Sequence, residues 1–87
     1  METTARIAKV WAIPYDHAAS FFQQQPDVIS LKDGFAFNNC RIRLFSLPDR
    51  SLGSLLFPQM KIIIEGQPDD VEAIYKRFSF NFLSAGG

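Results

Sequence analysis

The sequence predicts an α+β fold: one antiparallel sheet of about five strands with two helices on one of its faces. Short segments in which apolar and polar residues alternate are typical of strands, and an apolar stripe at helical spacing follows Gly66. A hairpin signal at Asp33-Gly34 separates two of the short segments. Together they give the element order β-α-β-β-β-β-α.

The chain begins with a predicted strand from Ala5 to Ile13, which Pro14 ends. A helix capped by Asp16 is expected next. Its apolar positions are Ala18, Ala19, Phe21 and Phe22. The glutamines before Pro26 end this helix, because a residue that precedes proline is disfavoured in the α region.

Two short strands follow, at Val28–Lys32 and Phe35–Phe37. Asp33 and Gly34 between them suit a type I′ turn, which needs positive φ at both central residues. Asn38-Asn39 then forms a bulge or a tight turn.

Two longer strands are expected at Arg41–Leu47 and Leu55–Glu65, separated by a turn at Pro48–Ser51. Pro58 cannot donate a hydrogen bond to a sheet, so it marks an edge or a bulge. Gly66 ends the second of these strands.

The last element is a helix that starts at Pro68, with Asp69 and Asp70 at the positive end of its dipole. Its apolar stripe is Val71, Ile74, Tyr75, Phe78 and Phe82. Residues 78–83 also alternate, so a final strand there stays an alternative. Gly86-Gly87 closes the sequence.

The length of 87 residues predicts a single domain over 1–87. Formal net charge is zero, which argues against strong nonspecific binding of nucleic acid. The first residues lack the pattern of a signal peptide, and no apolar run approaches the ~20 residues of a membrane span. A cytoplasmic protein without membrane contact is therefore predicted.

Few residues suit catalysis or metal binding. A lone cysteine, Cys40, excludes an internal disulfide and a cysteine zinc site, and a lone histidine, His17, excludes sites with several histidines. A Cys40–His17 nucleophile pair is the remaining catalytic alternative. We expect a small buried thiol instead. We therefore predict no enzyme, no catalytic residue, no metal site and no cofactor.

The second half of the chain resembles one repeat of the TATA-box-binding protein family. The similar motifs are Leu55-Leu56-Phe57, Lys61 four residues after this phenylalanine, Gly66, and the acidic helix start at Asp69-Asp70. The upstream Arg41-Ile42-Arg43, followed by a proline, is also similar, and the resemblance spans about Arg41 to Phe78. It implies the β-α-β4-α fold of one repeat.

That family has two repeats, so the resemblance implies that a homodimer supplies the second half here. It also implies a DNA-wedging role for Phe57, because that ring occupies the Leu-Leu-Phe position. Glu65 departs from the family, since a carboxylate there repels phosphates, and Pro58 alters the hairpin. The resemblance therefore supports the fold of the family more strongly than it supports DNA binding.

The period of two along the two long strands places several side chains on the sheet face that the helices leave free. The predicted binding residues are Arg41, Arg43, Phe45, Phe57, Lys61 and Ile63. Nine phenylalanines in so small a chain fit a dense core, or alternatively a partly aromatic surface that another molecule covers.

We expect an interaction module that binds a second copy of itself, as a homodimer, or another protein. One alternative is a nucleic-acid-binding domain that uses the same face, with Phe57 and Phe35 or Phe37 as stacking rings. The other is a sulfur-carrier or ubiquitin-like protein, because those proteins end in diglycine, as Gly86-Gly87 does here.

Overall fold

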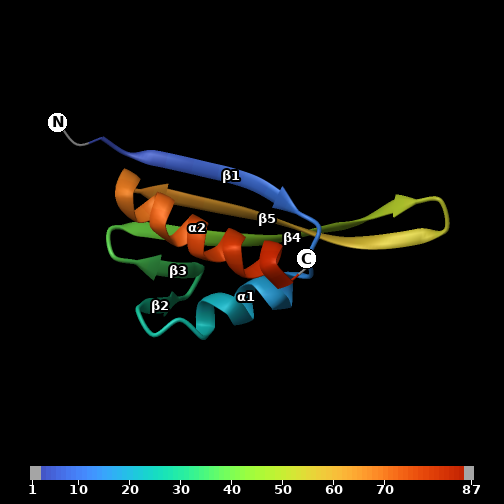
Figure 1. Cartoon of the computed structure of the whole chain (residues 1–87), viewed down its shortest axis with the longest axis horizontal. Helices are drawn as coiled ribbons and strands as arrows, with labels where there is room; N and C mark the ends of the chain where they lie inside the picture. Colours follow the sequence, from blue (N-terminus) through green and yellow to red (C-terminus); the bar gives the residue numbers. More distant parts are fainter. Residues whose placement is uncertain (1–2, 86–87) are drawn as a thin grey trace.

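The computed structural model describes residues 3–85 and shows one open antiparallel sheet and two helices (Figure 1). The elements are β1 (Ala5–Trp11), α1 (Tyr15–Gln23), β2 (Val28–Leu31), β3 (Gly34–Phe37), β4 (Cys40–Leu52), β5 (Leu55–Gly66) and α2 (Pro68–Ala85). The strand order is β1-β5-β4-β3-β2, so β1 and β2 are the edges. The first strand therefore pairs with the last one.

Both helices cover the same face of the sheet, and the core lies between these two layers. Alternate residues of the strands point into it, because successive side chains of a strand face opposite sides. The sheet contributes buried Phe35, Phe37, Ile42, Met60, Ile62 and Ile64. The helices contribute buried Ala18, Phe21, Phe22, Val71, Ile74 and Phe78.

Aromatic rings join the two helices to each other and to the sheet. Phe22 of α1 stacks on Phe78 of α2, with ring centroids 5.5 Å apart and planes 4° from parallel. Trp11 at the end of β1 packs on Phe78 in a T-shaped arrangement, with ring centroids 5.1 Å apart. Phe21 and Phe82 pack on Phe78 at 5.7 Å and 4.8 Å. Phe78 is thus the centre of the cluster and is fully buried.

Polar contacts attach α2 to the rest of the fold at its start and at its middle. At its start, Asp70 accepts hydrogen bonds from the backbone N–H of Asn39 (3.1 Å) and the side-chain amide of Asn38 (3.3 Å). Asn38 has φ +50°, a left-handed conformation that asparagine tolerates in a tight turn. Further along, Arg77 forms an ion pair with Asp27 at 2.8 Å. These hydrogen bonds from Arg77 hold the pKa of Asp27 below its usual range.

The hairpin of β4 and β5 is much longer than the strands beside it. We call its outer part, residues 47–59, the arm. It projects beyond the helices, and the molecule is 50 Å long but only 28 Å and 26 Å in its other dimensions (Figure 1). The arm turns at Gly53-Ser54, where Gly53 has φ +63°.

A β-bulge lies at the base of the arm. Leu47 pairs with Gln59 and Arg50 with Phe57, so two residues of β4 lie opposite Pro58 alone. The side-chain amide of Gln59 donates a hydrogen bond to the carbonyl oxygen of Pro48 at 3.1 Å. The bulge accommodates both prolines, because it interrupts pairing where proline has no N–H to donate.

Much of the predicted architecture is confirmed. The element order, the antiparallel sheet, and the two helices on one face are as expected. The apolar stripe of α2 faces the core, and residues 78–83 are helical, which decides against a final strand there. The bulge at Pro58 was one of the two roles expected for that proline.

Three local predictions were wrong. Pro48–Ser51 is not a turn but part of β4, because the bulge lets the strand continue through the proline. The two-residue turn before β3 is Lys32-Asp33, with neither residue at positive φ, and Gly34 already pairs with Leu31. Asp16 lies inside the first turn of α1 and does not cap it, since the N-cap position is Pro14.

The central position of Phe78 predicts its effect on stability. We expect Phe78→Ala to lower the free energy of unfolding by about 3–5 kcal/mol, because it leaves a cavity among the rings. Phe80→Ala is the matched control, since Phe80 is 74% exposed, and should change it by no more than about 0.5 kcal/mol. Urea unfolding measures both. Equal effects would contradict this packing.

Candidate interaction surface

The sheet face opposite the helices is not covered by any other described part of the chain, and we call it the free face. Its central strands contribute Arg41, Arg43 and Phe45 of β4 and Lys61, Ile63 and Glu65 of β5. Its edges contribute Arg6, Ala8 and Val10 of β1, Ala36 of β3, and Ile29 and Leu31 of β2. The pairing register places these residues together. Each is adjacent in the sequence to a residue that faces the core, and successive side chains of a strand point to opposite faces.

The structure brings five of the six predicted binding residues together. Arg43 lies opposite Ile63, and Phe45 lies opposite Lys61. Arg41 is the next residue on this face of β4, opposite Glu65. Their exposure differs: the Phe45 ring is 41% exposed, whereas Ile63 is only 6% exposed between Ala8 and Arg43.

Phe57 lies apart from this group. It is in the arm, paired with Arg50, four residues along β5 from Lys61, a separation of about 13 Å. Its ring is 36% exposed. The two other aromatic candidates, Phe35 and Phe37, are buried in the core at 7% and 5% exposure, so they present no ring to a ligand.

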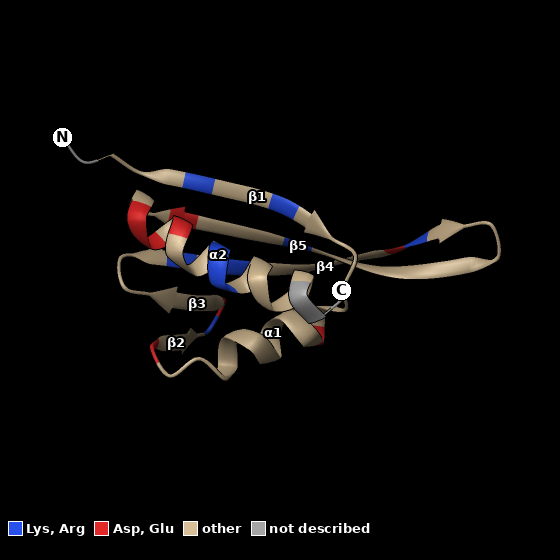
Figure 2. Ribbon diagram, viewed as in Figure 1, with Lys and Arg blue, Asp and Glu red and all other residues tan. Residues whose placement is uncertain are grey.

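Charge is concentrated on the free face although the chain is neutral. Four cations lie there, Arg6, Arg41, Arg43 and Lys61, against the carboxylate of Glu65. Acidic residues gather instead at the start of α2 (Figure 2). Within residues 3–85, Glu65 forms an ion pair only with Arg6, at 3.9 Å. Arg43 lies 5.9 Å from the Phe45 ring, a cation–π contact.

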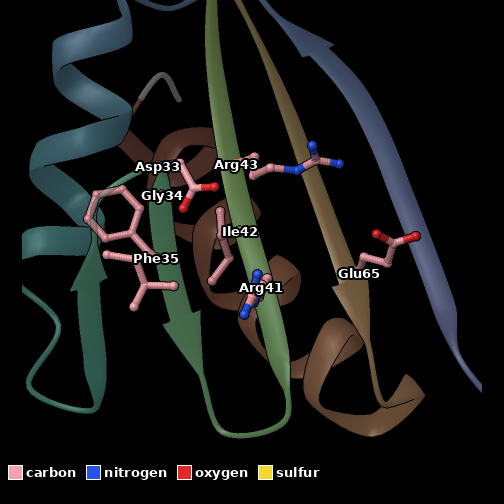
Figure 3. A pocket seen from close by; sticks show the side chains of 8 residues that line it. Asp33, Gly34, Phe35, Arg41, Ile42, Arg43 and Glu65 are labelled. Atoms are coloured by element: carbon pink, nitrogen blue, oxygen red, sulfur yellow. The ribbon is translucent and has the colours of Figure 1, made fainter.

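A hollow lies where the free face meets β3. Asp33, Gly34, Arg41, Arg43 and Glu65 line it together with Leu31, Phe35 and Ile42. A Cβ on Gly34 would collide with the carbonyl oxygen of Ile42, so the close approach of β3 to β4 requires glycine at this position. Figure 3 shows Arg43 extending from β4 toward β5, with Asp33 on the other side of β4. Two arginines and two carboxylates give the hollow no net charge.

Sequence reasoning missed part of the exposed surface. On the free face, Val10 is 56% exposed and Ile29 is 66% exposed. In the arm, Leu52, Leu55 and Leu56 are 52%, 60% and 68% exposed. The alternation of residues along Ala5–Ile13 could have predicted that Val10 lies on the free face. No sequence signal gave the arm, because the proline motif within it was interpreted as a turn.

The residues with catalytic chemistry do not come together. Cys40 begins β4, next to the turn that Asp70 contacts at the start of α2, whereas His17 lines a hollow with Asn81 and Phe82 near the other end of that helix. Burial, with the Asp70 charge nearby, raises the pKa of the Cys40 thiol to about 11. Such a thiol is not a thiolate at neutral pH, so it is not an activated nucleophile.

Comparison with known proteins adds no family to these observations. Neither the scan of protein-family models nor the search of curated proteins found a match. The resemblance to the TATA-box-binding protein repeat therefore stays a prediction from the sequence. In residues 3–85, no helix has the length and hydropathy of a bilayer span, and no cluster of three or more metal-ligating side chains occurs. Gly86 and Gly87 lie outside the described residues.

The buried thiol gives a direct test of the catalytic alternative. We expect the native protein to react slowly with a thiol reagent at pH 8, because Cys40 is 4% exposed and its pKa is raised to about 11. The same reaction in denaturant is the control and should be fast. The absorbance of the thiolate that the reagent releases measures the reaction rates of the native and the denatured protein. Rapid stoichiometric reaction of the folded protein would restore Cys40 as a candidate nucleophile.

Proposed function

We propose that this chain is a non-enzymatic interaction module that associates with a second copy of itself. The observation that carries the proposal is the amount of apolar surface that the fold leaves uncovered. Most of it lies in two regions outside the core, the free face and the arm, and Phe80 and Leu83 add exposed apolar surface on α2. Monomeric proteins rarely expose large contiguous apolar patches, and such patches mark interaction sites.

The surface area supports the same proposal. The chain exposes 5960 Å², whereas a compact monomer of 9.9 kDa exposes about 5,200 Å². The excess is close to the ~800 Å² that each partner buries in an interface of standard size. A second copy would therefore cover about as much surface as this elongated shape adds.

A non-enzymatic role is favoured by the chemistry of the described residues. The lone thiol is buried and resists ionisation. The histidine is exposed near the other end of α2. The hollow beside Gly34 contains side chains of both charges but no nucleophile beside a base. These features suit recognition more than catalysis.

Self-association predicts the native mass. Light scattering across a concentration series should give a mass near twice 9.9 kDa at high concentration and a lower mass on dilution. The physical reason is the uncovered apolar surface, whose burial favours association. A mass of 9.9 kDa at every concentration would overturn the proposal.

The charge of the free face favours a second candidate function, nucleic-acid binding. The cations of β1, β4 and β5 lie on one face with the exposed Phe45 ring beside them. Cations bind phosphates, and an aromatic ring stacks on unpaired bases. This local excess of positive charge is invisible in the neutral composition. The carboxylate of Glu65, on the same face, reduces this excess of positive charge.

This second candidate predicts a salt-dependent affinity for a labelled single-stranded oligonucleotide. The double variant Arg41→Ala/Arg43→Ala should weaken binding and reduce the slope of log K against log salt by about 2, because each arginine neutralises one phosphate. Lys76→Ala, on the exposed side of α2, is the control and should change neither. Fluorescence anisotropy measures these values. Unchanged affinity in the double variant would exclude this face as the site.

A further inference from the structure

The arm is the part of the sheet with the fewest neighbours. Strand β3 pairs with β4 only as far as Ile42, and β1 pairs with β5 only as far as Met60. Beyond these points both strands of the hairpin have an open outer edge. The helices end their contact with the sheet near the same place, since Met60 is the last fully buried residue of β5 toward the arm.

Apolar side chains occupy the end of this arm. Leu52 pairs with Leu55, and Phe57 pairs with Arg50, so these three apolar residues share one side of the hairpin with Arg50. Leu56 lies on the other side, opposite Ser51. The leucines are more than half exposed. A two-stranded ribbon this exposed is marginally stable unless something packs on it.

The arm carries fewer charged residues than the free face, which makes it the better surface for contact with a second copy. Its charged residues are Asp49 and Arg50, one of each sign. A twofold contact on the side of Leu52 therefore brings only one like charge of each copy together, that of Arg50. A twofold contact between free faces would instead oppose Arg41, Arg43 and Lys61 to the same cations of the other copy.

The prolines at the base limit how another strand can join. Pro48 and Pro58 have no N–H to donate, and each lies in a different strand of the arm. Continuous strand addition along the arm is therefore blocked at its base, as in natural edge protection. The outer residues 50–57 keep their side chains available for packing.

From these observations we propose that the arm of one copy packs against the arm of a second copy. The contact is isologous and centres on the side of the hairpin formed by Leu52, Leu55 and Phe57. This inference rests on the proposed self-association and names the surface that carries it. The dimer would then leave the cationic free face of each copy open to other ligands.

The test compares two matched double variants by sedimentation across a concentration series. Leu52→Ser/Leu55→Ser should raise the dimer dissociation constant at least tenfold, because it removes the apolar contact. Val10→Ser/Phe45→Ser, which changes similarly exposed residues of the free face, should leave the constant unchanged. Urea unfolding confirms that each variant is folded.

Hydrogen exchange of the unmodified protein keeps the test independent of these variants. Backbone amides of residues 50–57 should become better protected as the protein concentration rises, whereas those of β1 should not. If the unmodified protein stays a monomer, the proposed function itself fails. If it is a dimer but the arm variant dimerises normally, or the arm gains no protection, the arm contact is wrong and self-association stands.

Discussion

The stack of Phe22 on Phe78 holds the two helices together on one face of the sheet, and the rest of the molecule depends on that arrangement. Trp11 extends the cluster to the edge strand β1. Because both helices pack on this face of the sheet, no described helix covers the opposite face. The position of the cluster also sets how far along the sheet the helices reach, and the arm begins where that cover ends.

Two different surfaces result from this one constraint. The free face combines cations with a few apolar side chains, which suits an anionic ligand more than a second identical face. The arm is mostly apolar and has no net charge, so contact with its own copy opposes fewer like charges than contact between free faces. A neutral composition thus conceals a molecule whose charge is segregated between a basic sheet and an acidic helix start (Figure 2).

Periodicity was enough to predict the fold, because strands and helices bury residues at different spacings. It also placed Arg41, Arg43, Phe45, Lys61 and Ile63 on one face. It failed at Pro48, where proline was interpreted as a turn although a bulge carries the strand past it. Bulges depend on the partner strand, which local sequence does not specify. Hence the arm and its exposed leucines were not foreseen, and the distance of Phe57 from the other five predicted residues was not foreseen either.

The central claim is that arms meet across a twofold axis, and an intermolecular distance tests it most directly. Ser54→Cys places a spin label at the tip of the arm, while the native Cys40 is buried. Pulsed dipolar spectroscopy on the dimer should then give a separation within one arm length, about 20 Å. No short intermolecular distance, or tips separated by about the 50 Å length of the molecule, would contradict the account.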